Sequence, residues 1–427
     1  MRLNIEKLVY GGEGLARAEK MTVFVPFVLP GEEVEAQFAE RKKNFAHARL
    51  ESVVSASPDR RPAPCPYFAR CGGCHYQHMD YERQVEAKKE ILRETLRRTG
   101  KLEWTQPIAA ITAEPFGYRN RTRLRVHHAG SFEIGYHQHR SHRLVAVREC
   151  PISSPLINRV LAALWKLGEG GGFPPSIREV EFFANADDSQ LLLELVLHVA
   201  PGAEERAALD AFAAEVRQAA PEVVGLSAFL PLAESADYGK AVWSAGATSL
   251  DYRAASDTYR VSAGSFFQTN RFLTERLIEL AVGESRGELA LDLYAGTGLF
   301  SLPLARRFAQ VVAVESAPAS FSDLRANVPA KVKPVRATTE DYLRQQGAKL
   351  RPELIVVDPP RAGLGDKVIP ILVQAKAPHL CYVSCDPATL ARDLQALVAS
   401  GYRIDSLHLV DLFPQTFHME TVVRLSR

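Results

Sequence analysis

The chain has 427 residues, 46% hydrophobic and 24% charged, a composition that excludes a wholly disordered protein and allows about two to four domains. Lysine and arginine number 52 and aspartate and glutamate 50, so the net charge of +2 does not by itself indicate a nucleic-acid binder. No apolar run approaches the roughly 18 residues of a membrane span, and Glu6 interrupts any secretory signal. We therefore expect a cytoplasmic protein with no membrane partner.

Residues 1–57 have the pattern of a small β-rich unit, because their strand-like runs are separated by Gly and Pro turns. Residues 41–43, with Phe45, form a basic and aromatic tip. Such a tip is either a solvated loop or, on a small barrel, a contact for RNA phosphates. Residues 55–64, SASPDRRPAP, are typical of a linker.

Four of the six cysteines suggest a metal site. Cys65, Cys71 and Cys74 lie in a Pro- and Gly-rich loop, and Cys150 could fold back onto them. Zinc and a [4Fe-4S] cluster both accept four thiolates. Zinc sites commonly use two paired short spacings, whereas the fourth cysteine here is solitary, so the pattern favours iron–sulfur over zinc. Four buried thiols without a metal are the remaining alternative.

A basic stretch follows the cysteine loop. The amphipathic pattern of residues 81–99 predicts a helix. Residues 116–148 then contain seven arginines and one acid, with arginines at every second position of a predicted strand. Such a row can follow RNA phosphates, or it can be a strand face with counter-ions from elsewhere in the fold. We call these residues the arginine row: Arg119, Arg121, Arg123 and Arg125.

Residues 58–260 otherwise have the pattern of an α+β region without a further motif. From residue 261, predicted strands alternate with helices, which is typical of an open, doubly wound α/β sheet. The predicted strands are 289–294, 310–315, 332–336, 353–358 and 379–384, and two last strands, 402–412 and 419–425, suggest an antiparallel hairpin at the sheet edge.

A cofactor site is expected where the first of these strands meets its helix. Gly296 and Gly298 form a turn that a ligand can approach, and Glu315, 23 residues after Asp292, can hold both hydroxyls of a ribose. A dinucleotide fingerprint would have a third glycine at Ser301. Its absence disfavours NAD and favours S-adenosylmethionine, which has a ribose but no phosphate.

Cys385 and Glu420 are the candidate catalytic pair. Cys385 lies between a predicted strand and a helix, at the carboxyl edge of the sheet, where a helix N-terminus increases thiolate character. Thiolate addition to carbon 6 of uracil lets carbon 5 take a methyl group, and a general base must then remove the carbon-5 proton. Glu420 could be that base. Asp358 closes a strand and could accept hydrogen bonds from the cofactor or the uracil, whereas Cys381 lies within its strand and is expected to be packed.

This combination resembles the bacterial RNA (uracil-5-)-methyltransferase family that modifies 23S ribosomal RNA and tRNA, specifically its iron–sulfur members. The resemblance covers essentially the whole chain, and the N-terminal segment resembles the TRAM domain, an RNA-binding β-barrel. The motifs that carry it are SFFQTN (265–270), LDLYAGTGLF (291–300), VVAVE (311–315), DPPRAGL (358–364), SCDPATLARDL (384–394) and FPQTFHMETV (413–422).

The resemblance implies a multidomain α/β protein: an OB-like barrel at 1–57, a central α+β domain at 58–260 and a class I methyltransferase sheet at 261–427, with helix 81–99 packed on the catalytic sheet. The family often has Cys and Asn where this chain has Ala295 and Leu299. The resemblance implies S-adenosylmethionine contacts from Gln268, Tyr294, Glu315 and Asp358, Cys385 as nucleophile, Glu420 as proton acceptor, and Cys65, Cys71, Cys74 and Cys150 as [4Fe-4S] ligands.

The expected substrate is RNA, with 23S rRNA favoured over tRNA, contacted by residues 1–57 and 116–148, and the expected state is a monomer. Phe266 or Phe267 either stacks near the target base or belongs to the core. The alternatives are tRNA uracil-C5 methylation, cytosine-C5 methylation and a non-catalytic RNA-binding protein. The metal cluster is expected to be structural, with a redox sensor as the alternative.

Overall fold

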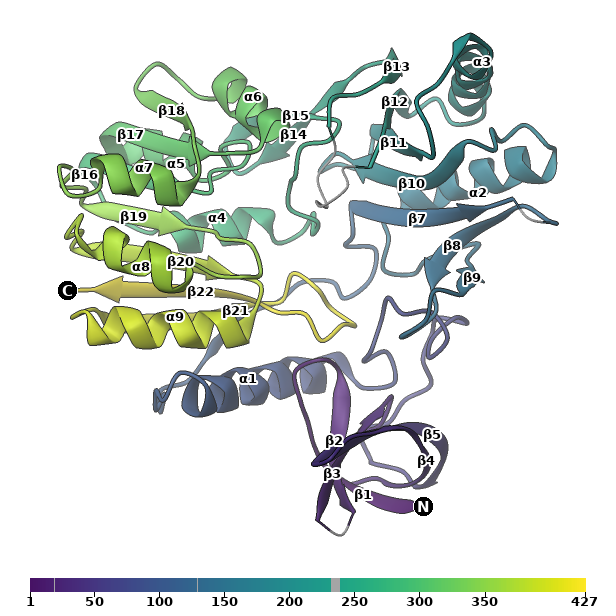
Figure 1. The fold of residues 1–427 in the computed structure, drawn as a ribbon, viewed down its shortest axis with the longest axis horizontal. Helices are drawn as coiled ribbons and strands as arrows, with labels where there is room; N and C mark the ends of the chain where they lie inside the picture. Colours follow the sequence, from purple (N-terminus) through teal and green to yellow (C-terminus); the bar gives the residue numbers. More distant parts are fainter. Residues whose placement is uncertain (19, 129, 232–238) are drawn as a thin grey trace.

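The computed structural model describes every residue except 19, 129 and 232–238. Residues 19 and 129 belong to the two segments expected to contact RNA, and 232–238 belong to the central region, so these positions lie outside the described residues. A barrel, a central sheet and a large α/β sheet follow one another along the chain (Figure 1). No helix in the described part of the chain has the length and apolar character needed to cross a membrane.

The N-terminal strands close into a barrel in the order β1-β2-β3-β5-β4. Buried and exposed residues alternate along β1, and Leu3 and Ile5 point into a small core with Val23, Val25 and Val34. This alternation is what a strand with one face on a core requires. The strands are β1 (Arg2–Leu8), β2 (Glu13–Ala18), β3 (Met21–Pro26), β4 (Glu33–Arg41) and β5 (Phe45–Ser55).

The central sheet has seven strands in the order β13-β12-β11-β10-β7-β8-β9, and helices α2 and α3 contribute to its apolar core. Helix α2 begins where Ser154 caps the backbone N–H of Ile157 and Pro155 occupies the first turn. The elements are β7 (Arg121–His127), β8 (Glu133–His137), β9 (Leu144–Ala146), α2 (Pro155–Glu169), β10 (Ile177–Ala184), β11 (Leu191–Leu197), α3 (Ala203–Ala219), β12 (Val223–Phe229) and β13 (Trp243–Gly246).

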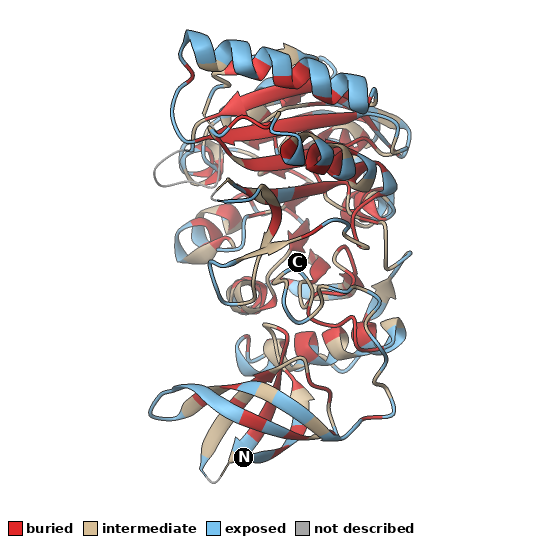
Figure 2. Cartoon of the chain, turned by 90° about the vertical axis from the view of Figure 1, so that its right-hand side faces the viewer, coloured by how far each residue is buried: buried red, intermediate tan, exposed pale blue. Residues whose placement is uncertain are grey.

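The C-terminal sheet has eight strands in the order β18-β17-β16-β19-β20-β22-β21-β6. Its strands are mostly buried. Figure 2 faces the central sheet, where buried strands likewise lie beneath helices whose outer faces are exposed. The strands are β16 (Gly287–Leu293), β17 (Phe308–Glu315), β18 (Val332–Arg336), β19 (Leu354–Val357), β20 (His379–Ser384), β21 (Arg403–Val410), β22 (Glu420–Ser426) and β6 (Ala109–Ile111).

Helices cover both faces of this sheet, so the predicted doubly wound α/β fold is confirmed. Alternate residues of β16 enter different cores: Leu291 and Leu293 pack with helices α1, α7, α8 and α9, whereas Ala290 packs with α4, α5 and α6. The helices are α1 (Tyr81–Arg98), α4 (Thr274–Val282), α5 (Ser301–Arg307), α6 (Pro318–Asn327), α7 (Thr339–Gln346), α8 (Gly365–Val373) and α9 (Pro387–Ala399).

The edge of this sheet differs from the prediction. Strands β21 and β22 are antiparallel, as expected, but the three-residue strand β6 pairs with β21 and forms the edge. Helix α1, which precedes β6, packs on the catalytic sheet, where Lys88 makes a fully buried ion pair with Asp411 at 2.6 Å. The hairpin β14–β15 (Ser249–Ala254, Asp257–Ser262) also packs against this sheet's core. Helix α1, strand β6 and the β14–β15 hairpin, which precede the other strands in sequence, therefore complete the C-terminal sheet, which we also call the catalytic sheet.

Candidate active site

Four predicted site residues, Glu315, Asp358, Cys385 and Glu420, lie at one edge of the C-terminal sheet. Asp292 lies at the same edge, near the end of strand β16. Parallel strands β17, β16, β19 and β20 all end there, and the antiparallel strand β22 begins there. We call the ionisable side chains at these strand ends the sheet-edge row: Glu315, Asp292, Asp358, Cys385 and Glu420. Open α/β sheets bind ligands outside the carboxyl ends of their strands.

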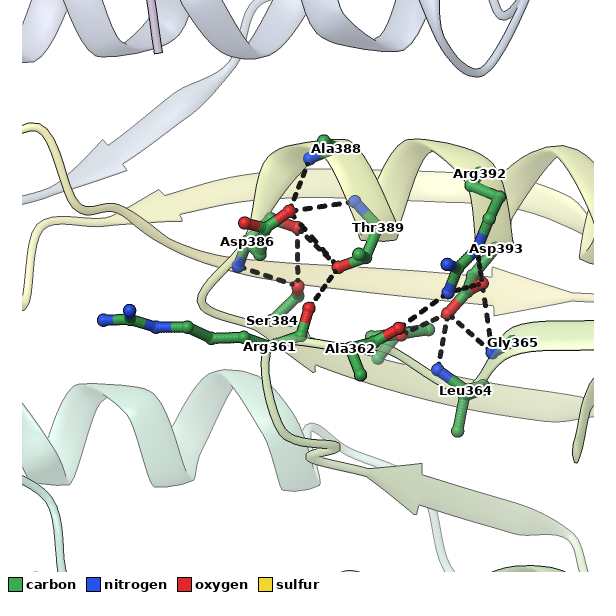
Figure 3. Close-up of polar contacts among 11 residues, drawn as sticks. Arg361, Ala362, Leu364, Gly365, Ser384, Asp386, Ala388, Thr389, Arg392 and Asp393 are labelled. Carbon is green, nitrogen blue, oxygen red and sulfur yellow. Dashed lines mark hydrogen bonds and ion pairs between the residues drawn. The ribbon is translucent and has the colours of Figure 1, made fainter. Parts of the chain in front are cut away.

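The turn that carries Cys385 is fixed by hydrogen bonds. Asp386 caps helix α9: its Oδ1 accepts from the backbone N–H groups of Ala388 and Thr389, both at 2.9 Å (Figure 3). The Thr389 hydroxyl donates to the carbonyl of Arg361 at 2.9 Å. The turn that carries Cys385 is thus joined to the loop that follows Asp358.

Asp393 holds the far side of the same loop. Its Oδ2 accepts from the backbone N–H of Leu364 at 2.6 Å and from the Tyr382 hydroxyl at 2.7 Å (Figure 3). Gly363 has a φ of +73°, and a Cβ there would lie 2.5 Å from Asp393. The loop therefore needs glycine at this position to approach helix α9.

The electrostatics of Cys385 differ from the sequence expectation. Burial raises the pKa of its thiol to about 12, the carboxylates of Glu420 and Asp358 act in the same direction, and Arg361 opposes them. The expected gain in thiolate character from the helix N-terminus is wrong for the unliganded site, because desolvation and neighbouring negative charge outweigh it. Reaction of this thiol as a nucleophile would therefore require a neighbouring group that takes its proton.

Two carboxyl groups of the row, Asp292 and Glu420, are buried and partly without partners, whereas Asp358 and Glu315 are half-buried. Burial raises the pKa of Glu420 well above its usual range, with Asp358 acting in the same direction, and raises the pKa of Asp358 and of Asp292 to about 7. Among the described residues, Oε1 of Glu420 and Oδ1 of Asp292 have no hydrogen-bond partner. Buried polar atoms normally have partners, so these two oxygens mark a place that a ligand can complete.

The glycine turn has the conformation that a close ligand requires. Gly296 and Gly298 have φ values of +54° and +95°, and Tyr294 also has a positive φ of +65°. Glu315 supports the turn, because its Oε2 accepts from the N–H of Gly296 at 2.8 Å and its Oε1 from that of Ala317 at 2.6 Å. The predicted ribose acid and glycine turn thus lie together.

Three further positions around the turn have defined places. Ala295 and Leu299, where the family often has polar residues, are buried and belong to the core. Ser301, where a dinucleotide site would have glycine, donates its hydroxyl to Asp292. In the sequence, Asp292 served only to measure the spacing to Glu315. Ser301, five positions after Gly296, carries a hydroxyl that could have indicated a hydrogen-bond partner for Asp292.

The segment 265–270 lies where the central and catalytic sheets meet, because the backbone of Asn120 bonds to Thr269 and Arg119 pairs with Asn270. Gln268 is buried there. Phe267 is buried in the core, whereas Phe266 is 62% exposed. Of the two phenylalanines, only Phe266 is available to a substrate base.

The arginine row is largely not a free phosphate-binding surface. Arg121 is buried and bonds to Glu181 and Glu194, and Arg123 and Arg125 pair with Glu181 and Glu179 on strands β10 and β11. The ion pairs match the alternative of a strand face with counter-ions from elsewhere in the fold. Arg121 is buried away from a ligand, whereas the side chains of Arg123 and Arg125 are 37% and 39% exposed. Glu179 and Glu181 also occupy alternate positions of strand β10, and this acidic pattern is visible in the sequence.

Arg119, the first residue of the row, lies with the cysteines. Together with Cys65, Cys71, Cys74 and Cys150 it lines a cavity of about 260 Å³. All four cysteines are outside disulfides, and burial is the main factor that raises the thiol pKa of Cys65, of Cys74 and, to about 11, of Cys71. In the described part of the chain, no group of three or more His, Cys, Asp or Glu side chains is arranged to hold a metal ion.

The four cysteines and Arg119 are among sixteen residues that line this cavity. Zinc, with sulfur bonds of about 2.3 Å, and a [4Fe-4S] cluster both accept four thiolates. The Nε of Arg119 is buried without a partner among the described residues, and a cationic group beside thiolates would offset the negative charge of a bound cluster.

The cysteine loop is attached directly to the catalytic loop that precedes Glu420. The backbone N–H groups of His75 and Tyr76, which follow Cys74, both donate to the carbonyl of Gln415, at 2.8 and 3.0 Å. The side chain of Gln84 on helix α1 also bonds to Gln415. The cysteine loop therefore contacts the segment that leads to Glu420, although the two are far apart in sequence.

Comparisons with known proteins agree with this geometry. The family model described as tRNA (Uracil-5-)-methyltransferase matches residues 80–427, and the TRAM domain model matches residues 1–50. A 23S rRNA (uracil(1939)-C(5))-methyltransferase RlmD of Pseudomonas putida is 34% identical, with 99% of this chain and 92% of the relative covered. An uncharacterized RNA methyltransferase of Aquifex aeolicus is 31% identical, with 100% and 98% covered.

A solved structure gives the same fold. The tRNA (uracil-54, C5)-methyltransferase of Pyrococcus abyssi, in complex with S-adenosyl-L-homocysteine, has a TM-score of 0.78 and 25% identity, with 100% of both chains covered. The family match and the relatives cover nearly the whole chain, so they apply to the barrel and the catalytic sheet together. The chain therefore belongs to the tRNA (uracil-5-)-methyltransferase family, and it is an S-adenosylmethionine-dependent RNA (uracil-5-)-methyltransferase with an N-terminal TRAM domain.

Proposed function

We propose that the enzyme methylates carbon 5 of a uridine in 23S rRNA, with Cys385 as the nucleophile and Glu420 as the base. The observation that carries this assignment is the sheet-edge row. A thiol and a buried carboxyl with an unsatisfied oxygen lie at the ends of neighbouring strands, beside the loop of Asp358. The reaction requires that pair of groups.

Each group has a defined part in the reaction. The Cys385 thiol gives its proton to the carboxylate of Asp358 as sulfur bonds to carbon 6, and the double-bond electrons move toward carbon 5, while Glu420 stays ionised for the later step. S-adenosylmethionine supplies the methyl group that carbon 5 then takes. Glu420 removes the carbon-5 proton, the electrons of that bond restore the double bond, and the sulfur of Cys385 leaves. Burial raises the pKa of Glu420, so its carboxylate, once ionised, is a stronger proton acceptor than an exposed one.

We assign cofactor binding to the glycine turn and its neighbours. Glu315, already fixed by two backbone N–H groups, presents its carboxylate to a ribose. The turn itself lets the ligand approach the backbone, and Asp358 closes the neighbouring strand. The proposed contacts are Gln268, Tyr294, Gly296, Gly298, Glu315 and Asp358.

We further propose that Cys65, Cys71, Cys74 and Cys150 hold a [4Fe-4S] cluster, with zinc as the alternative. The shared cavity supports this assignment, and the bonds from the cysteine loop to Gln415 support a structural role, because loss of the cluster would release the loop that leads to Glu420. Protein purified without oxygen should show the broad visible absorbance of an iron–sulfur cluster. A colourless protein containing one zinc would contradict the assignment.

The choice of 23S rRNA over tRNA rests on the name of the relative from Pseudomonas putida. We propose that a monomer in the cytoplasm binds the RNA through residues 1–57, the exposed parts of 116–148 and Phe266. We also infer three domains, 1–57, 58–260 and 261–427, with helix α1, strand β6 and hairpin β14–β15 assigned to the catalytic unit.

One experiment tests the reaction and the target together. Unmodified 23S rRNA and tRNA are incubated separately with enzyme and S-adenosylmethionine, then digested for nucleoside mass spectrometry. We expect 5-methyluridine in the 23S rRNA alone. 5-Methyluridine in the tRNA alone would replace the target, 5-methylcytidine would replace the reaction, and no methylated pyrimidine in either pool would contradict the proposal.

A further inference from the structure

A side chain of the N-terminal barrel reaches the nucleophile turn. Tyr10 lies in the turn between β1 and β2, and its hydroxyl donates to Oδ2 of Asp386 at 3.1 Å. The other oxygen of Asp386 caps helix α9. Both carboxylate oxygens of the residue that follows Cys385 are therefore held, one by the helix and one by a tyrosine 376 positions away in sequence.

The turn that carries Tyr10 is shaped for this contact. The Tyr10 ring packs edge-on against Phe417 with centroids 5.4 Å apart, and Phe417 in turn packs against His75 at 4.7 Å. Gly12 has a φ of +86°, and a Cβ there would lie 2.9 Å from the His75 ring. Only glycine allows this close approach, so the barrel turn, the cysteine loop and the catalytic loop meet around one aromatic group.

The charges around Cys385 give this contact a chemical consequence. Burial is the main cause of the raised pKa of the Cys385 thiol; Glu420, Asp358 and Asp386 add to it, and Arg361 opposes it. Tyr10 contacts Asp386 and also interacts electrostatically with Arg361 and Cys385, and its own pKa is raised mainly by burial and next by Asp386, so it stays a hydroxyl donor. Donation to Asp386 draws negative charge away from the thiol.

We propose that Tyr10 is a positioning residue of the reaction, through which the RNA-binding barrel orients Asp386 and adjusts its charge beside the nucleophile. The role of Cys385 in this inference rests on the proposed function. The barrel is then a part of the catalytic machinery as well as a binding domain. If the barrel turn moved away from Asp386, Cys385 would stay in place but its thiol would react more slowly.

The test measures Cys385 itself and does not need the RNA. The Tyr10→Phe variant keeps the ring and removes only the hydroxyl. Alkylation by iodoacetamide at fixed pH between about 7.5 and 9.5, read at the Cys385 peptide by mass spectrometry, is proportional to the thiolate fraction. We expect alkylation about three- to tenfold slower than in the wild type, as for a rise of roughly half to one unit in the thiol pKa. Equal rates would overturn the proposal.

Two further variants fix the route of the effect. Tyr402→Phe, which removes a buried hydroxyl bonded to the Ala377 carbonyl at 2.9 Å, is the matched control and should alkylate at the wild-type rate. Asp386→Asn keeps a capping oxygen without the charge, so Cys385 should react faster than in the wild type. Tyr10→Phe should then have no further effect in the Asp386→Asn background. An equal slowing in both backgrounds would show that the hydroxyl does not act through Asp386 and would overturn the proposal.

Turnover separates this inference from the proposed function. With 23S rRNA, Tyr10→Phe should lower kcat by about the factor seen in alkylation and leave KM unchanged. A change confined to KM would instead make Tyr10 an RNA contact and would overturn the positioning role. If the wild-type enzyme forms no 5-methyluridine while the alkylation pattern holds, the proposed function fails and the assignment of Tyr10 to Asp386 and Cys385 stands.

Discussion

The arginine row and the sheet-edge row both consist of ionisable residues at strand positions, yet the structure treats them in opposite ways. Arg121 is buried between Glu181 and Glu194 and is satisfied by them. Glu420 and Asp292 are equally buried, and each keeps an oxygen without a partner among the described residues. Oε2 of Glu194 also lacks a partner, but Glu194 is neutralised by Arg121, whereas no ion pair reaches Glu420 or Asp292 among the described residues. A buried carboxyl without a neutralising cation is the better candidate for a ligand site.

The largest expected effect comes from the thiol of the sheet-edge row. Cys385→Ala should lower 5-methyluridine formation at least about 10³-fold, because no other group can form the adduct. The matched control is Cys381→Ala, which removes a fully buried thiol four residues earlier in strand β20 and should keep most activity. Single-turnover assays with 23S rRNA measure both. Comparable losses in the two variants would remove the distinction between a catalytic and a packed cysteine.

The arginine row should instead affect stability. Arg121→Leu leaves the buried Glu194 without its ion-pair partner and Glu181 paired with Arg123, and it should lower the free energy of unfolding by about 3–5 kcal/mol. Arg123→Leu, whose side chain is 37% exposed, should cost about 1 kcal/mol or less. Urea denaturation measures both. A stable Arg121→Leu protein with weakened RNA binding would restore the row as an RNA contact.

The pH dependence of stability distinguishes a buried carboxyl that has an oxygen without a hydrogen-bond partner from one whose hydrogen bonds are made. Burial raises the pKa of Asp292 to about 7, so its contribution to stability is present below its usual pKa, near 3.8, and is lost as the pH rises through about 7. Asp292→Asn should therefore gain about 1–3 kcal/mol over the wild type at pH 8 and nothing at pH 4.

The control for this prediction is Asp323, whose carboxylate accepts from the Ser262 backbone at 2.7 Å and from the Ser265 hydroxyl at 2.6 Å. Asp323→Asn should lower the unfolding free energy by about 1–2 kcal/mol at pH 8, because it weakens bonds that are made. Chemical denaturation at several pH values measures both variants. Destabilisation of Asp292→Asn at pH 8 would contradict the account of the unsatisfied carboxyl.

The smallest expected effect is that of replacing Phe266, and its neighbour Phe267 is the comparison. Phe266 is exposed, so Phe266→Ala should weaken RNA binding by about 1 kcal/mol through loss of base stacking and leave stability unchanged. Phe267 is buried, so Phe267→Ala should lower stability by about 3–5 kcal/mol. Filter binding and thermal melting measure the two properties. The opposite pattern would place Phe267 at the substrate.

The sequence was sufficient to predict the sheet-edge row because strand order is not needed for it. Every parallel strand of an open α/β sheet ends at the same edge, so Glu315, Asp358 and Cys385 could be placed there from their positions after predicted strands. The glycine turn at 296–298 and the four cysteines were also recognisable, because their spacing is local. Asp292 was seen only as part of a motif.

The remaining features depend on contacts between distant segments. The neutralisation of Arg121 by Glu194 requires knowing that β7 and β10 pair and that β11 follows. Strand β6 has three residues, too few for a hydrophobic period. The reach of Tyr10 to Asp386 depends on how the barrel sits on the catalytic sheet, and no spacing in the sequence encodes that arrangement.

The central claim is that Cys385 and Glu420 act in succession on one uridine, and Glu420→Gln tests it most directly. This variant can add its thiol and receive the methyl group but cannot remove the carbon-5 proton. After incubation with 23S rRNA and S-adenosylmethionine, nuclease and protease digestion should give a Cys385 peptide that carries a methylated uridine, and the Cys385→Ala, Glu420→Gln double variant should give none. An absent adduct, or one on another residue, would contradict the account.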